Sequence, residues 1–245
     1  MRPKQAFIFA FLITALITIN IFIFTLINSK TQTVLITRVI DGDTIEIQST
    51  ERIRLLNINS PEKNQPGYEQ AISYLKKFEN KTVQIKTSEK DKYGRTLARI
   101  YTPSYLNLEL VEKGYAKKFL VSSDETKIFA KAEARAIENQ QGIWKKSPYF
   151  NCFQTQIHPE KEIIFLQINC PQINLNSWYL EDESRKKYIL SSIGVNKISI
   201  HTFKGNDNQT DIFLNSKQDI WNNDRDTVYL FDEKGKLAHY NAYGY

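Results

Sequence analysis

Short runs of alternating or continuous apolar residues predict a small β-structure over the first third of the folded chain. "VLITRVI" (34–40), "TIEIQ" (44–48) and "RIRLLNI" (52–58) are separated by the polar turns "DGD" and "STE", which predicts a three-stranded meander. "TVQIKT" (82–87) and "TLARIYT" (96–102) flank the polar "SEKDKYGR" and predict two more strands.

Helical spacing of apolar residues appears in three places. From Pro66 to Asn80 apolar residues recur every three or four positions. "LNLELVEKG" predicts a short helix that ends at Gly114, and a longer one runs from about Asp124 to Gln141. Five strands and three helices predict an OB-type barrel in an α+β unit at residues 31–150.

The pattern changes after "KKSPYF" (145–150). Short β-rich runs follow with almost no helical periodicity: "EIIFLQI", "SWYLED", "KISIHTF", "TVYLFDE" and "LAHYNAY". Asn, Gly and Asp turns separate them, which is typical of a β-sandwich. We therefore expect an all-β second domain at residues 155–245.

The first thirty residues have a different character. Residues 6–27 carry no charge, and as a helix they would rise about 33 Å, enough to cross a bilayer core. Arg2 and Lys4 precede them, so the positive-inside rule predicts a single-pass anchor at residues 1–30 in the cell membrane, with both domains outside. The alternative is a signal segment that is cleaved to release a secreted protein.

Charge and cysteine content add two modest expectations. Lys and Arg exceed Asp and Glu by six between residues 30 and 148 and fall two short after residue 148. A basic first domain suits a polyanionic partner. The two cysteines, Cys152 and Cys170, either form one bridge, as an oxidising exterior allows, or remain two buried thiols.

Three charged clusters in the first domain suit phosphodiester hydrolysis. They are "DGDT" with Asp41 and Asp43, "IRLLNINSPE" (53–62), and "DKYGR" (91–95). That reaction needs a metal at the phosphate, a carboxylate to take a proton from water, and cations to grip the phosphate oxygens. Arginine suits the last task because its planar fork binds two oxygens at once.

Taken together, "VIDGDTIEI", "IRLLNINSPE", "DKYGRTLARIY", "LVEKGYAK" and "EARAIENQQGIW" resemble the staphylococcal nuclease (thermonuclease) family over about residues 34–146. The resemblance implies an OB-type barrel with three helices and a calcium-dependent phosphodiesterase that cleaves DNA and RNA to 3′-phosphate ends. Matched motif by motif, it implies that Asp43 binds calcium through its carboxylate and Ser60 through its main-chain carbonyl, with Asp41 at a nearby acidic position. It also implies that Arg54 and Arg95 are the catalytic cations that bind the phosphate. Glu62 occupies the position of the general base.

Two short segments, one at Asn59 and one at Phe119 and Leu120, depart from the family pattern. Asn59 stands where well-known members have a second calcium-binding aspartate. Its amide oxygen still suits calcium, but one negative charge is lost, so we expect weaker metal binding. Phe119 and Leu120 replace tyrosines of the substrate site, and Phe119 is either a base-stacking or a core aromatic. Lys92 and Tyr93 are the remaining expected substrate contacts.

A second resemblance concerns residues 158–245. "SWYLEDE" and "IWNNDRDTVYLFDEKGKLAHYNAY" resemble the lamin-tail domain, an immunoglobulin-like β-sandwich, which implies an unidentified surface ligand. "WNNDRD" is either a calcium or sugar site or a hairpin turn beside a core tryptophan, and three histidines show no ligand spacing. The sequence thus predicts an exported nuclease; the alternative is a surface module that binds nucleic acid with little or no cleavage.

Overall fold

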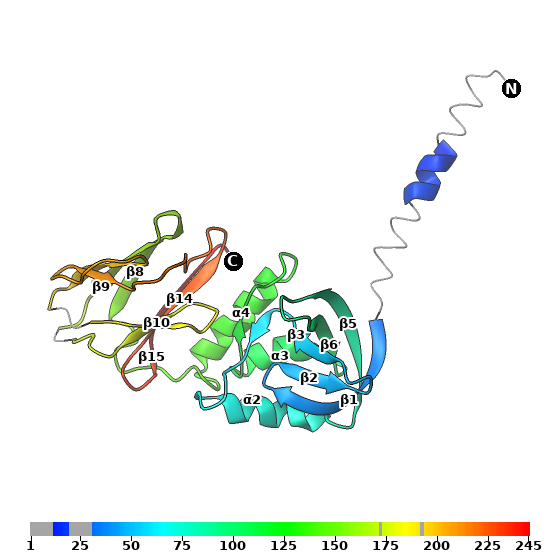
Figure 1. Ribbon diagram of the computed structural model, residues 1–245. Coiled ribbons are helices and arrows are strands. Elements are labelled where there is room, and N and C mark those ends of the chain that lie inside the picture. The colour runs from blue at the N-terminus through cyan, green and yellow to red at the C-terminus, as the bar shows by residue number, and fades with distance from the viewer. Residues whose placement is uncertain (1–11, 20–30, 172, 192–193) are drawn as a thin grey trace, which may run out of the picture.

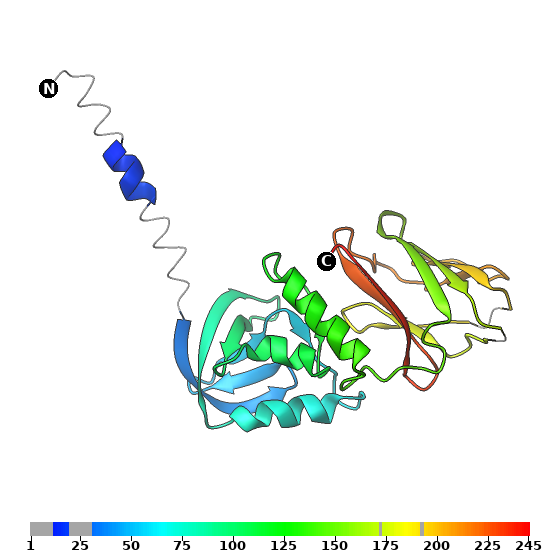
Figure 2. The ribbon, with the colours of Figure 1, turned by 180° about the vertical axis from the view of Figure 1, so that it is seen from behind.

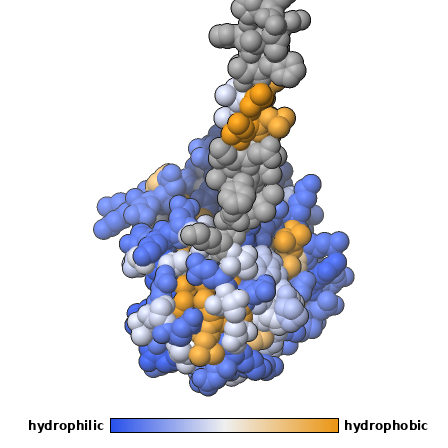
Figure 3. Space-filling view, turned by 90° about the vertical axis from the view of Figure 1, so that its right-hand side faces the viewer, coloured by the Kyte–Doolittle hydropathy of each residue, from blue (hydrophilic) through white to orange (hydrophobic). Residues whose placement is uncertain are grey.

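The computed structural model describes residues 12–19, 31–171, 173–191 and 194–245. Residues 12–19 are helical, and their apolar side chains are exposed, whereas most of the folded body visible beside them is hydrophilic (Figure 3). In these four ranges no helix has both the length and the hydropathy needed to span a bilayer. Most of the predicted span, residues 6–27, lies outside the described residues, so the anchor stays a prediction.

Five strands form the closed barrel predicted for the first part of the chain. The order β1-β2-β3-β6-β5 joins β1 (Thr31–Asp41), β2 (Thr44–Ile47), β3 (Arg52–Leu55), β6 (Thr96–Tyr101) and β5 (Thr82–Lys90). All neighbours are antiparallel except β3 and β6, which run parallel. The inward residues of the alternating pattern, such as Ile36, Ile45 and Ile85, are buried in one core. A barrel leaves no free sheet edge.

Three helices cover the barrel, close to where their periodicity predicts them. α2 (Tyr68–Leu75) continues into a 3-10 turn at Lys76–Phe78, α3 spans Leu106–Glu112, and α4 spans Thr126–Glu138. Each buries one apolar face, with Leu75, Leu110 and Phe129 entering the core of the barrel. A separate two-stranded sheet joins β4 (Ile58–Asn59) to β7 (Lys117–Lys118). This small sheet carries one candidate site residue, Asn59.

Two four-stranded sheets form the rest of the chain, and we call them the C-terminal sheets. One has the order β11-β10-β14-β15 and the other β13-β12-β9-β8. Their bounds are β8 Phe153–His158, β9 Ile163–Ile168, β10 Tyr179–Glu181, β11 Lys187–Ile189, β12 Lys197–His201, β13 Asp211–Phe213, β14 Asp226–Phe231 and β15 Leu237–Tyr243. The pattern of the sequence indicated five of these strands and missed β8, β11 and β13, two of which have only three residues.

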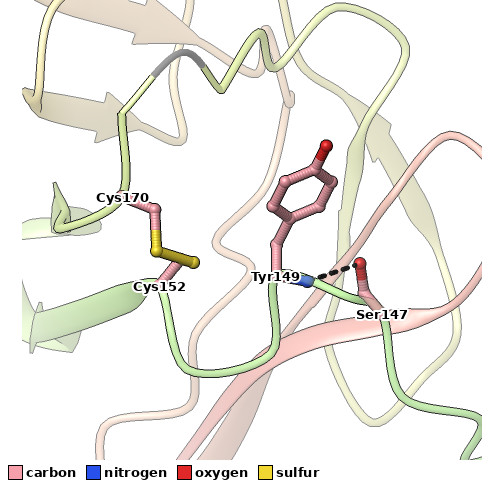
Figure 4. Close-up of a disulfide and its surroundings, with 4 residues drawn as sticks. All are labelled: Ser147, Tyr149, Cys152 and Cys170. Carbon is pink, nitrogen blue, oxygen red and sulfur yellow. Dashed lines mark hydrogen bonds between the residues drawn. A yellow bond between two sulfur atoms is a disulfide. The ribbon is translucent and has the colours of Figure 1, made fainter.

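Cys152 and Cys170 form a disulfide, which decides between the two alternatives left by the sequence (Figure 4). It links the segment before β8 to the segment after β9, with the two Cα atoms 5.2 Å apart. Tyr149 and Ser147 lie beside it, and the Tyr149 main-chain N–H donates to Ser147 Oγ at 3.3 Å. The bridge therefore closes the open end of the β8–β9 hairpin.

The C-terminal sheets pack against the barrel at α4 and β7 (Figures 1 and 2). A small apolar cluster crosses the junction, with Ile137 and Trp144 on one side and Tyr229, Phe231 and Leu237 on the other. The main chain also crosses it, because Ser147 N donates to Leu237 O and Leu237 N donates to Lys145 O, each at 2.8 Å. The boundary predicted at residues 150–155 stays a prediction, but the two parts share buried contacts.

Candidate active site

Asp43 is a buried residue of the candidate site. It lies in the turn before β2, whereas Asp41 is the last residue of β1. Asp43 is buried, and its two carboxylate oxygens accept hydrogen bonds from Thr44 Oγ1 at 3.0 Å and from the Ser60 N–H at 3.1 Å. These bonds fix the carboxylate next to the turn that carries Asn59 and Ser60.

Gly42 makes this arrangement possible. A Cβ at Gly42 would lie 2.7 Å from Ser60 Oγ and 2.8 Å from the Cβ of Ala71 on α2. Because such distances are shorter than van der Waals contact, only glycine lets the turn approach both neighbours. The glycine of "DGD" thus brings Asp43 against Ser60.

Arg54 brings the oxygens of Asp43 and Asn59 toward one another. Its Nη2 lies 3.3 Å from Asp43 Oδ2 and 3.5 Å from Asn59 Oδ1. Its Nη1 donates to the main-chain carbonyls of Leu55 and Ile58, at 3.2 and 3.0 Å. The guanidinium is thus held at four points, with only 13% of its side chain exposed.

Asn59 contacts the barrel on one side and the C-terminal sheets on the other. Its Nδ2 donates to Ser184 O at 3.0 Å and to Glu183 O at 3.4 Å. The side chain is buried, with 9% relative exposure for the residue. The asparagine therefore links the candidate site to the loop that follows β10.

Glu62 is exposed at the rim of the site, just beyond Pro61. Its main-chain N–H donates to Gln65 Oε1 at 3.0 Å, which fixes the turn before α2. Partial burial raises the pKa of Glu62, the nearby carboxylates of Asp41 and Asp43 raise it further, and Arg54 and Arg185 oppose them. A carboxylate with a raised pKa is a better proton acceptor, as a general base requires.

Asp41 ends β1 at the side of the site. Its Oδ1 accepts the Gly42 N–H at 2.7 Å. Burial raises the pKa of Asp41, and the neighbouring Asp43 raises it further, whereas the Gly42 N–H, Arg54 and Arg95 lower it. Asp41 is therefore an electrostatic neighbour of Asp43, Arg54 and Arg95.

Arg95 lies at the far end of the "DKYGR" loop and is held by its own loop. Its Nε and Nη2 both lie 2.7 Å from Asp91 Oδ2. The guanidinium carbon is 5.4 Å from the ring centre of Tyr93, which is 71% exposed. Lys92 is also exposed and lies over the same ring. The structure thus groups Arg95, Tyr93 and Lys92 on one accessible loop, separate from the Asp43–Arg54 contact.

Phe119 follows β7 and is half-buried. It lines a pocket of about 220 Å³ at the junction, together with Leu120, Ser184, Arg225, Tyr245 and several acidic side chains. The predicted alternatives for Phe119 were stacking and core packing. The pocket leaves part of the ring reachable, so the stacking role stays open as a proposal.

The oxygen atoms of Asp43 and of the neighbouring candidate residues are suitable ligands for a hard cation. Calcium prefers oxygen ligands. Three are offered here: the carboxylate of Asp43, the amide oxygen of Asn59 and the main-chain carbonyl of Ser60. Among the described residues, no three His, Cys, Asp or Glu side chains form a metal-binding group. A cation held by these residues would have one carboxylate, one side-chain amide oxygen and one main-chain oxygen as ligands.

Comparison with known proteins agrees with this geometry. Residues 52–146 match the model of the staphylococcal nuclease homologue family. A thermonuclease from Staphylococcus intermedius is 35% identical over 127 residues, which is 46% of this chain and 76% of that protein. This chain belongs to the staphylococcal nuclease family.

Further members of the family are similar to the same region. An uncharacterized endonuclease from Escherichia coli O157:H7 is 34% identical over 116 residues, 44% of this chain and 74% of that protein. Endonuclease YhcR from Bacillus subtilis is 34% identical over 138 residues, but the match spans only 11% of its length. These relatives support nucleic acid hydrolysis by this chain.

The sequence does not reveal which residues join this nuclease-like site to the C-terminal sheets. Gln65 and Arg185 meet at 3.4 Å, and Lys117 and Lys118 are fully buried. A lysine pair in "YAKKFL" has no pattern that distinguishes it from a solvated pair, and Arg185 lies in a polar turn. Only the packing of the two parts shows their importance.

Proposed function

We propose that this chain is an exported, calcium-dependent nuclease that hydrolyses phosphodiester bonds of DNA, RNA or both to 3′-phosphate products. The observation that carries the proposal is the convergence at Arg54, where one guanidinium meets oxygens of Asp43 and Asn59. Glu62 lies three residues from Asn59 on the same turn. Membership of the nuclease family supports the reaction class.

Each candidate residue has a defined task in this proposal. Asp43, Asn59 and Ser60 would hold calcium, which supplies positive charge at the scissile phosphate. Glu62 takes the proton from the attacking water, because its carboxylate is exposed at the rim and its main chain is fixed by Gln65. Asp41 adds negative charge beside Asp43.

The two arginines bind the phosphate oxygens as negative charge develops in the transition state. Arg54 is already oriented by two carbonyls of its own turn. Arg95 must exchange its contact with Asp91 for the phosphate, so its loop moves or reorients on binding. Lys92, Tyr93 and Phe119 contact the rest of the nucleic acid.

Export is part of the same proposal. The Cys152–Cys170 disulfide is typical of proteins outside the reducing cytosol. The uncharged residues 6–27 anchor the chain in the cell membrane with the folded parts outside; release after cleavage of this segment is the alternative. The C-terminal sheets, with their resemblance to the lamin-tail domain, bind an unidentified surface ligand.

The test follows cleavage of labelled single-stranded DNA and RNA by the full-length chain in mild detergent. We expect cutting that rises with calcium, stops on chelation, and falls at least a hundredfold in Glu62→Gln, within the range attributed to a general base. Glu69→Gln, an exposed carboxylate on α2, is the matched control and keeps full activity. Treatment of the products with a 3′-phosphatase identifies their ends.

Two results would contradict the proposal. Tight binding without cleavage at any calcium concentration would leave a surface module that captures nucleic acid. Cleavage that persists in Glu62→Gln would exclude Glu62 as the base. Protease accessibility of the folded parts on intact cells tests export separately.

A further inference from the structure

The loop between β10 and β11, residues 182–186, belongs to the C-terminal sheets but lies against the nuclease site. We call it the β10–β11 loop. It meets the site segment, residues 59–65, at two points: Asn59 at one end and Gln65 at the other. Ser60 and Glu62 lie between these contacts. Both ends of the segment that carries the candidate base are therefore held by a part of the chain more than 115 positions away.

The first contact determines which way the Asn59 amide faces. Main-chain carbonyl oxygens only accept hydrogen bonds, so the two carbonyls at Glu183 and Ser184 require the NH₂ group of the amide. The amide oxygen then points the other way, where it lies 3.5 Å from Arg54 Nη2. The β10–β11 loop thus directs an oxygen, and not an NH₂ group, toward Arg54, which also contacts Asp43.

The second contact reaches the main chain of Glu62. Gln65 Oε1 accepts the Glu62 N–H at 3.0 Å and the Arg185 Nε–H at 3.4 Å. A single amide oxygen accepts both because it has two lone pairs. Arg185 Nη1 is shielded from solvent and has no hydrogen-bond partner among the residues that the structure describes. Arg185 therefore acts on the site through its hydrogen bond to Gln65 and through the positive charge that it places near Glu62.

The flanks of the β10–β11 loop are fixed to the barrel by buried charges. Lys117 Nζ lies 2.7 Å from Glu181 Oε2 and 3.2 Å from Asp182 O. Lys118 forms an ion pair with Glu183. Because these groups are almost fully buried, their partners cannot be replaced by water without a large cost. The loop is therefore a stable support for the site segment.

We propose that the β10–β11 loop is a positioning element of the nuclease site, with Arg185 as its positioning residue for the Glu62 turn and its carbonyls as the support of Asn59. The inference rests on the proposed nuclease function. It gives the C-terminal sheets a role in the reaction itself, beyond attachment to a surface. Loosening the loop displaces the base and the amide oxygen together.

The test compares Arg185→Ala, Gln65→Ala and the double variant in the full-length chain with labelled single-stranded DNA and a calcium titration. We expect each single variant to lower kcat about tenfold and to raise the half-saturating calcium concentration severalfold, as removal of supporting contacts does at other metal sites. KM for DNA changes less than twofold. The double variant loses less activity than the product of the two single losses, because both single variants remove the Arg185–Gln65 contact.

Lys186→Ala is the matched control, because it removes a positive charge from the same loop, and its exposed side chain lies over the ring of Tyr188. It keeps wild-type kinetics. A smaller folded fraction alone would lower kcat without moving the calcium requirement, so the two readouts together identify positioning. Arg185→Lys, which keeps the charge, restores part of the loss.

Failure of the inference is distinguishable from failure of the proposed function. If wild type shows no Glu62-dependent cleavage, the proposed function is wrong and the inference falls with it. If wild type cleaves in a Glu62-dependent way while Gln65→Ala and Arg185→Ala keep its kcat and calcium requirement, the inference alone is wrong. If Arg185→Ala does not fold, Gln65→Ala decides by the same criteria.

Discussion

Asn59 shows how one side chain serves two neighbours. From the sequence, its amide is a weakened calcium ligand, because a carboxylate would add a negative charge. In the structure, its NH₂ group also donates to two main-chain carbonyls of the C-terminal sheets. A carboxylate has no proton for these carbonyls at neutral pH. The packing of the chain therefore requires an amide at position 59, even though a carboxylate would bind calcium more tightly.

Asn59→Asp is expected to destabilise the calcium-free protein by about 2 kcal/mol, because two donated hydrogen bonds are replaced by contacts between oxygens. Urea unfolding without calcium measures this free energy. Asn64→Asp, in the exposed turn after Glu62, adds the same charge without a carbonyl partner and should change stability by less than about 0.5 kcal/mol. Equal stability of Asn59→Asp and wild type would show that the loop does not need the amide.

His239 on β15 makes stability depend on pH. Burial lowers its pKa to about 4, and its Nε2 lies 3.0 Å from Thr155 Oγ1. Between pH 4 and 6.5 the unfolded chain binds a proton that the folded chain does not, so stability falls as pH drops through this window. The loss amounts to at most about 3 kcal/mol.

His239→Gln removes the titrating group and should make the free energy of unfolding depend less on pH between pH 4 and 6.5. Asp226 acts in the opposite direction, because burial and the nearby Glu183 raise its pKa to about 7. The measured quantity is therefore the difference in unfolding free energy between variant and wild type at each pH. His158→Gln, whose side chain is 39% exposed, is the control. A constant difference from pH 4 to 7 would contradict the role of His239.

At the scale of elements, the two-residue strand β7 contributes more to the junction than its length suggests. Lys118 lies 3.1 Å from Glu133 of α4 and also pairs with Glu183 beyond β10. Burial alone would lower the pKa of Lys118, but these two carboxylates raise it, so the lysine stays protonated. Tyr229 donates to the same Glu133 at 2.7 Å. One charged cluster thus joins three elements.

Lys118→Met is expected to lower the free energy of unfolding by about 3 kcal/mol or more, because two buried carboxylates lose their cation. The midpoint of urea unfolding gives this value. Lys127→Met, at an exposed position of α4, removes a lysine without such partners and should be nearly neutral. A loss below about 1 kcal/mol would mean that the carboxylates find other donors.

The elements that sequence patterns predicted are those with strong periodicity or specific motifs. The five barrel strands and the three helices follow from alternation and from three- to four-residue spacing, because each buries one face in a single core. β11 and β13, with three residues each, are too short for such a pattern. Trp221 is buried and Asn222 Nδ2 donates to Asp226 Oδ2, which agrees with the turn, one of the two alternatives for "WNNDRD".

The candidate site was predictable only on its barrel side. Asp43, Arg54, Asn59 and Glu62 lie on adjacent strands and turns, so their order in the motif brings them together. The contacts of Arg185 with Gln65 and of Ser184 with Asn59 join residues 120 and 125 positions apart. No local pattern encodes such long-range packing of two different parts of the chain.

At the scale of the whole molecule, the shared apolar cluster predicts that the barrel and the C-terminal sheets unfold together. Trp144 is fully buried and stacks on Tyr229, with ring centres 5.2 Å apart. We expect a single calorimetric transition in the wild type, with equal calorimetric and van't Hoff enthalpies. Trp144→Ala should lose about 3 kcal/mol or more and separate the transition into two.

Phe203→Ala is the control for this experiment, because it removes an aromatic ring that is 47% exposed and lies away from the cluster. It should keep the single transition with little change in midpoint. Two transitions in the wild type would show that the junction is too weak to couple the parts, and the β10–β11 loop would then be a less rigid support.

The buried lysines of β7 also limit how this chain can be truncated for use as a module. A fragment that ends near residue 150 would leave Lys117 without Glu181 and Lys118 with Glu133 but without Glu183. It would also expose the apolar surface around Trp144 to water. Such a fragment would invite aggregation, and an inactive preparation of it would say little about catalysis. For fusion, immobilisation or transfer into another host, we expect a module that keeps the barrel and the C-terminal sheets together to be more soluble than the barrel alone.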